Sequence, residues 1–132
     1  MRINSVIVSE NISNLPMPNN ENKVIIVQPL LSVRVPFIPT QLSFHFAIGL
    51  LDVEVNKEQK VTLVLSGPDE VECWKTEMPF VVAPDPNGKN NPNSIIHGDF
   101  RNIAFLYEGE YTLRAILENG ESASYKFMLI KE

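Results

Sequence analysis

The sequence has little of what usually identifies a function. A single cysteine, Cys73, stands among 132 residues, so the chain can form no internal disulfide. The eleven lysines and arginines are scattered and outnumbered by sixteen acids, unlike the basic clusters that bind nucleic acids and anionic membranes. No apolar run approaches the ~20 residues of a membrane-spanning helix. We therefore expect no nucleic-acid partner and no membrane partner.

The compartment and the number of domains are predicted from the same sparse features. The opening stretch M-R-I-N-S-V-I-V-S-E has no long apolar segment before its first acid, which predicts a first strand and not a signal peptide. Together with the lone cysteine, this favours a cytoplasmic location. The length predicts one domain over residues 1–132, large enough to fold without disulfides.

Helical periodicity is also scarce, and ten prolines interrupt most windows that could hold a helix. Short runs of Val, Ile, Leu and Phe alternate instead with clusters of Asn, Pro and Gly. This pattern predicts an all-β fold, an antiparallel two-sheet sandwich of immunoglobulin-like or C2-like type with about eight strands. Residues 11–22 are expected to form a loop. The runs expected to be extended are residues 2–9, 23–28, 31–35, 42–55, 60–66, 71–75, 78–82, 95–106, 110–117 and 121–130.

The last two runs predict a hairpin with a defined register. A two-residue turn at 119–120 would set apolar residues opposite polar ones along the whole ladder. A three-residue loop at 118–120 instead places Leu113 opposite Tyr125, so that the apolar faces of both strands agree. Because register follows the buried face, we predict the longer loop, with Gly120 left-handed in a bulge.

Two irregularities are expected in the middle of the chain. Large apolar residues fall on even numbers up to Leu50 and on odd numbers from Leu51 onward. A change of phase by one residue is what a β-bulge produces, and Gly49 stands where the strand would bend. The prolines of segment 36–39 exclude a central strand there, which suits a segment that leaves one sheet for the other.

The stretch Y-E-G-E-Y-T-L resembles the tyrosine corner of immunoglobulin-like domains, whose pattern is Asp-x-Gly-x-Tyr-x-Cys. Gly109 and Tyr111 match that pattern. Tyr107 takes the place of the aspartate and Leu113 that of the cysteine, which removes the disulfide of those domains. Trp74, the single tryptophan, is a candidate for the tryptophan of the sandwich core.

The polar connection at 85–99 holds the only candidates for a metal site. Asp85, Asn87 and Asp99 are weak candidate calcium ligands because they offer the oxygen atoms that calcium prefers. The loop is not an EF-hand, since Lys89 stands where a third oxygen ligand is required. We prefer the alternative of a solvated loop that joins two strands.

Catalytic groups are sparse as well. The thiol of Cys73 follows Glu72, and negative charge raises a thiol pKa, so we expect a packed, inert cysteine. Nothing in the sequence brings His45 or His97 to that thiol, as nucleophilic catalysis would require. Glu70 and Glu72, expected on one strand face, are the carboxylates that a hydrolase would use, with His97 as a further candidate.

As a whole, the pattern resembles a group of small bacterial β-sandwich proteins whose function is unknown. The resemblance is carried by V-P-F-I-P-T-Q-L-S-F at 35–44 and by G-E-Y-T-L-R-A-I-L-E-N-G-E at 109–121. It spans most of the chain and implies an immunoglobulin-like or C2-like sandwich. It implies no activity, so it assigns no functional residue and no cofactor.

These observations favour a non-catalytic binding or adaptor module over an enzyme, because a full set of strands comes without a catalytic constellation. The expected partner is a protein, bound through a sheet face or an edge strand, or a second copy of the chain. Two alternatives stay open. One is a calcium-binding sandwich of the C2 type that uses the 85–99 loop, and the other is a small hydrolase.

Overall fold

The computed structural model describes residues 1–18, 22–84 and 93–132. These residues form nine strands and one short 3-10 helix, which confirms the all-β prediction. No helix in these ranges is long and apolar enough to cross a membrane. The elements are β1 (Arg2–Pro16), β2 (Asn22–Pro29), β3 (Ser32–Val35), β4 (Thr40–Leu51), β5 (Glu58–Ser66), η1 (Pro68–Glu70), β6 (Glu72–Val81), β7 (Ser94–Phe105), β8 (Gly109–Leu117) and β9 (Ser122–Lys131).

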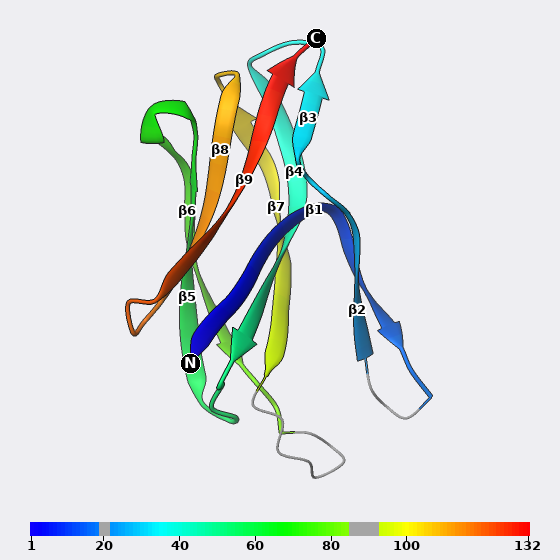
Figure 1. The fold of residues 1–132 in the computed structure, drawn as a ribbon, viewed down its shortest axis with the longest axis vertical. Coiled ribbons are helices and arrows are strands. Elements are labelled where there is room, and N and C mark those ends of the chain that lie inside the picture. Colours follow the sequence, from blue (N-terminus) through cyan, green and yellow to red (C-terminus); the bar gives the residue numbers. More distant parts are fainter. Residues whose placement is uncertain (19–21, 85–92) are drawn as a thin grey trace.

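The strands form two sheets that pack face to face as a sandwich (Figure 1). The four-stranded sheet has the order β2-β1-β4-β7, and the five-stranded sheet has the order β3-β9-β8-β5-β6. All neighbouring strands run antiparallel except β3 and β9, which are parallel. The predicted two-sheet sandwich is therefore confirmed, with one parallel pair as a correction to the purely antiparallel prediction.

Aromatic side chains from both sheets interlock in the core. Phe44 of β4 lies edge-on to Phe100, Phe105 and Phe127, with ring centroids 5.6, 6.2 and 5.8 Å apart. Tyr111 extends the cluster, since its ring lies 4.8 Å from that of Phe105 and is stacked on that of Phe127. Edge-on contacts of this kind contribute about 0.5–1.5 kcal/mol each beyond the burial of apolar area.

The predicted hairpin between β8 and β9 has the expected register. Leu113 pairs with Tyr125, and the amide of Leu117 donates to the carbonyl of Glu121 at 2.8 Å. Gly120 has a φ of +90°, a conformation that favours glycine. The three-residue loop is therefore confirmed, and its register aligns the buried faces of both strands.

The change of phase near Gly49 has a different origin from the one predicted. The bulge lies in β1, where the register shifts between Ile3 and Ser5 opposite Gly49, and not in β4. A Cβ atom on Gly49 would stand 2.8 Å from the hydroxyl oxygen of Ser5, so glycine permits this close approach. The strand β4 ends at Leu51, and Asp52 turns the chain with a φ of 57°.

The expected loop at 11–22 is a second correction. Residues 11–16 continue β1 and pair with β2, because the run V-I-I-V of β2 supplies an apolar strand partner. Strand formation at N-I-S-N-L-P thus depends on this pairing and not on local propensity. The two runs at 71–75 and 78–82 likewise join in one strand, β6. Segment 36–39 connects the two sheets between β3 and β4, as its prolines predicted.

The tyrosine-corner pattern makes the hydrogen bond that it predicts. The Tyr111 hydroxyl donates to the carbonyl oxygen of Tyr107 at 2.6 Å, and Gly109 between them has a φ of +138°. Burial raises the pKa of the Tyr111 hydroxyl, so it remains a donor at neutral pH. Trp74 is half-buried and packs on Phe100 with ring centroids 5.5 Å apart, at the edge of the core.

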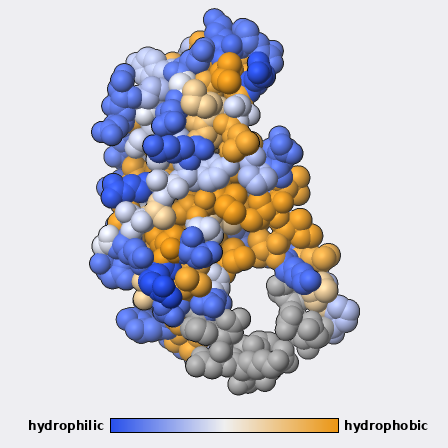
Figure 2. All heavy atoms as spheres, in the orientation of Figure 1, coloured by the Kyte–Doolittle hydropathy of each residue, from blue (hydrophilic) through white to orange (hydrophobic). Residues whose placement is uncertain are grey.

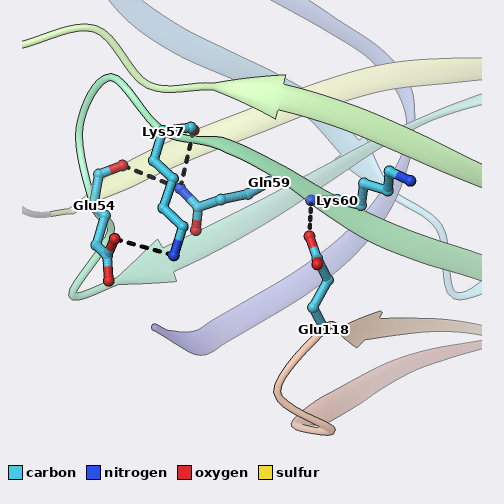
Figure 3. Close-up of polar contacts among 5 residues, drawn as sticks. All are labelled: Glu54, Lys57, Gln59, Lys60 and Glu118. Carbon is cyan, nitrogen blue, oxygen red and sulfur yellow. Dashed lines mark hydrogen bonds and ion pairs between the residues drawn. The ribbon is translucent and has the colours of Figure 1, made fainter.

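A buried glutamine holds the connection between β4 and β5 (Figure 3). The side-chain amide of Gln59, which is 7% exposed, donates to the carbonyl oxygens of Glu54 at 3.0 Å and Lys57 at 3.5 Å. The Lys57 ammonium also lies 3.2 Å from the Glu54 carboxylate. The backbone amide of Lys60 donates to the Glu118 carboxylate at 2.8 Å, which ties this connection to the β8–β9 hairpin.

We expect Tyr111→Phe to lower the free energy of unfolding by about 1 kcal/mol, because the ring stays packed while one part-buried hydrogen bond is lost. Urea denaturation measures the change. Tyr107→Phe is the matched control, since the side chain of Tyr107 is 60% exposed and only its backbone oxygen accepts the bond. Equal losses in the two variants would contradict a structural role for the hydroxyl group.

We expect Gln59→Ala to lower the free energy of unfolding by about 1–3 kcal/mol, because two loop carbonyl groups lose their buried donor. The matched control is Gln41→Ala on β4, whose side chain is exposed and should change stability by less than about 0.5 kcal/mol. Thermal or urea unfolding would test the difference, and a neutral Gln59→Ala variant would refute the role of the amide.

Candidate functional site

The structure leaves little of the predicted calcium site. Asp85 and Asn87 lie outside the described residues. Asp99 on β7 is already engaged, because its carboxylate accepts a hydrogen bond from the Arg101 guanidinium at 2.5 Å. This hydrogen bond is the main reason why the pKa of Asp99 lies below its ordinary value. In the three described ranges, no group of three or more His, Cys, Asp or Glu side chains gathers around a common point.

Cys73 is the extra residue of a bulge in β6, where Leu65 pairs with Trp74 and Ser66 with Glu72. The thiol approaches the carbonyl oxygen of Leu65 at 3.2 Å. Its pKa is raised, as predicted, but burial is the largest cause and the negative charge of Glu72 only a smaller one. The residue is nevertheless exposed at the surface, so the expectation of a fully packed cysteine is wrong.

The candidate hydrolase residues do not meet. Glu70 belongs to η1 and not to a strand, because Asp69 and Glu70 adopt left-handed φ values of 63° and 61° that turn the chain before β6. The prediction that Glu70 and Glu72 share a strand face is therefore wrong. Glu70, Glu72 and His97 line three separate hollows of the described surface.

The most distinctive feature outside the core is a two-stranded arm, formed by residues 10–16 of β1 and by β2 (Figure 1). The pairing of β1 with β4 ends at Ser9 and His45, while its pairing with β2 continues to Pro16. Ser9 is fully buried at this bend, and its hydroxyl donates to the carbonyl oxygen of Asn11 at 3.1 Å. The chain therefore leaves the sheet at a fixed point.

The arm folds over the outer face of the four-stranded sheet. Asn14 of the arm and His97 of β7 form a side-chain hydrogen bond of 3.3 Å. Ile12 shares the face of Asn14, since side chains alternate along a strand, and it is 6% exposed. Ala47, opposite His97 in the sheet, is 3% exposed. Neither Ile12 nor Ala47 belongs to the core cluster, so their burial reflects the cover that the arm provides.

A groove of about 680 Å³ lies between the arm and this sheet face. Among the described residues, amide, hydroxyl, imidazole and ammonium groups line it, and no carboxylate does. These groups can form hydrogen bonds, and the described lining offers no carboxylate pair for acid–base chemistry. Its polar lining residues include Asn4, Asn14, Lys23, Ser94 and His97.

The other face of the arm carries three exposed apolar side chains. Leu15, Ile25 and Val27 are 45%, 40% and 45% exposed and point away from the sheet. Hydrophobic side chains accordingly gather over the arm at the right of Figure 2. Strand β2 is also an edge strand, so in the described structure no strand pairs with the outer side of its V-I-I-V run.

The other three edge strands of the described sheets carry features that oppose pairing with a further strand. Strand β7 has Asp99 and Arg101 on its outer face and a bulge opposite β4. Strand β6 contains Lys75, Glu77 and Pro79. Strand β3 is only four residues long. The run 24–27 of β2 contains neither a charge nor a proline, which makes it the least protected edge.

For the cysteine, we expect slower alkylation by iodoacetamide at pH 8 in the folded protein than in the urea-unfolded chain. The physical reason is the raised pKa of Cys73, which leaves a smaller thiolate fraction than the ordinary cysteine pKa of about 8.5 would give. Glu72→Gln should change this rate only slightly, since burial is the larger cause. Equal rates in the folded and unfolded chains would refute the assignment.

The arm, its groove and the free edge of β2 thus form the candidate functional site. Sequence analysis recognised the apolar run of β2 but missed its position at a sheet edge, because the order of strands in a sheet is a tertiary property. The comparisons with known proteins add no assignment: no protein-family model matches the chain, and the search of curated proteins finds no relative.

Proposed function

We propose that the chain is a non-catalytic binding module that receives an extended segment of a partner protein at the free edge of β2. The observation that carries this proposal is the uncharged V-I-I-V run, unpaired on one side, in a molecule whose other edges are protected. Strand addition suits such an edge because main-chain hydrogen bonds supply affinity and alternate side chains supply specificity.

The two faces of the arm give the added strand two different environments. Every second side chain of the added strand would lie beside the exposed side chains of Ile25 and Val27. The side chains between them would point toward the polar groove, which Val24 and Asn14 line. A ligand with alternating apolar and hydrogen-bonding residues therefore fits this site, since side chains alternate along a strand.

The strand order supports an immunoglobulin-like type for this module. In immunoglobulin-like domains the second and fifth strands share one sheet, and the third, sixth and seventh share the other. Strands β4 and β7, and strands β5, β8 and β9, have this distribution. The hydrogen bond between Tyr111 and Tyr107 agrees with it. The insertion of β1 between β2 and β4, which creates the arm, is a departure from that type.

We place the module in the bacterial cytoplasm, where a reducing environment suits its single unpaired cysteine. The arm depends on side-chain contacts and backbone pairing alone, so it needs no disulfide.

The test uses octapeptides selected for binding to the intact chain from a random displayed library. We expect selected peptides to slow amide hydrogen exchange at residues 23–28 and nowhere else. Val27→Lys should weaken binding by about tenfold or more, because a charge on an edge strand opposes pairing. Val81→Lys is the matched control, since Val81 is an exposed residue at the end of the β6 edge.

Equal binding by both lysine variants, or protection that lies elsewhere, would refute the proposal. Sedimentation of the free chain decides between partners. A dimer that Val27→Lys dissociates would show that the occupant is a second copy, and the proposed role in binding another protein would then be wrong.

A further inference from the structure

A second hollow, which is apolar, lies far from the groove of the arm. It is at the end of the sandwich that holds the C-terminus (the upper end in Figure 1). Three large side chains surround it and are exposed: Val71, Leu106 and Tyr107 are 56%, 56% and 60% accessible. Cys73 and Tyr111 also line it. Its volume of about 180 Å³ is below the ~300–1,000 Å³ of most small-molecule sites, so it suits a single large side chain.

Close packing forms this hollow in advance. The bond from the Tyr111 hydroxyl to the Tyr107 carbonyl fixes the β7–β8 connection, which carries Tyr107 on the rim. A Cβ atom on Gly67 would stand 3.0 Å from the Tyr111 ring, and one on Gly109 would stand 2.8 Å from the Pro68 ring. The turn that carries Val71 is therefore packed directly against the start of β8. Because the hollow is formed in advance, little conformational freedom is lost on binding.

The two segments that frame this hollow are rich in acids. The two segments that frame it, residues 67–73 and 104–110, contain five acids and no lysine or arginine. Without these five, eleven of the sixteen acids remain, which equals the eleven lysines and arginines of the whole chain. The two segments thus carry the excess of acids in the sequence. Glu70 lines a different hollow and Glu110 lies on the outer face of the sheet, so Asp69, Glu72 and Glu108 are the acids left to attract cations near this hollow.

Most of this charge is not neutralised by the protein. Glu110 pairs with Lys126 at 3.5 Å on the outer face of the five-stranded sheet. Asp69, Glu72 and Glu108 have no ion-pair partner among the described residues. Glu72 lines the hollow itself, while Asp69 and Glu108 are sequence neighbours of lining residues.

From this combination we infer a second binding site. We propose that the hollow receives one large apolar side chain of a partner protein segment in which lysine or arginine flanks that side chain. The apolar lining contributes burial of the side chain, and the unpaired acids contribute attraction for the flanking cations. The site is independent of the β2 edge, so it goes beyond the function proposed above.

The probe is the blocked pentapeptide Lys-Lys-Phe-Lys-Lys, added to the intact chain. We expect backbone amide NMR shifts at Val71, Leu106 and Tyr107, and slower alkylation of Cys73 when the hollow is occupied. Lys-Lys-Gly-Lys-Lys should produce neither effect because it lacks the apolar side chain. Glu-Glu-Phe-Glu-Glu should produce neither because its charge is repelled. Added salt should weaken binding of the first peptide severalfold.

Leu106→Ala should raise the Kd at least about fivefold, whereas Leu31→Ala, a change at a leucine that is 75% exposed, should leave the Kd unchanged. Reversing the charge of Glu72, which lines the hollow, and of Glu108, a sequence neighbour of the lining residue Tyr107, in Glu72→Lys/Glu108→Lys should weaken binding more than Glu10→Lys/Glu58→Lys, which changes the net charge equally. Ile25→Lys on β2 should bind normally, which separates this site from the strand-addition site.

Several results would overturn this site. They are the absence of shifts at the rim residues, equal binding of the glycine peptide, and an unchanged Kd in Leu106→Ala. Self-association of the free chain would also overturn it if Phe37→Ala abolished that association. Phe37 is an exposed aromatic residue that follows Arg34, so this segment has the apolar side chain and the nearby cation that the hollow is proposed to receive. The occupant would then be a second copy of the chain.

Discussion

Interlocked aromatic rings between the two sheets are the interaction on which the rest of this structure depends. Phe44 and Phe105 from one sheet meet Phe127 and Tyr111 from the other, and the burial of all four removes a large apolar area from water. Once these faces are packed, the alternation of side chains determines which residues of each strand point into the core. What remains free is the outer faces, the edges and the ends of the sandwich.

Tyr111 links this core to the surface. Its ring packs on Phe105 and Phe127, while its hydroxyl holds the backbone of Tyr107. The same side chain lines the apolar hollow at the end of the sandwich. Because one buried residue serves the core, the corner and the hollow, the packing of the core also holds the backbone of Tyr107 beside that hollow.

The two proposed sites differ in physical character. At the arm, the unpaired backbone groups of β2 offer hydrogen bonds, and Ile25 and Val27 add exposed apolar side chains. At the end hollow, the apolar cavity is enclosed by side chains, and nearby acids such as Glu72 add an electrostatic field. One proposed site therefore suits an extended backbone, and the other suits a single side chain with its flanking charges.

The sequence alone was sufficient for the features that local pattern controls. Periodicity and prolines predicted the two-sheet sandwich, matching apolar faces predicted the 118–120 loop, and the Gly109–Tyr111 spacing predicted the tyrosine-corner bond. Tertiary structure decided the rest. The strand at 11–16 exists because β2 pairs with it. The exposure of the V-I-I-V run and the meeting of two acidic segments at the end hollow depend on strand order. Local patterns report which face of a strand is buried, but neighbours and edges are chosen only when distant segments pack.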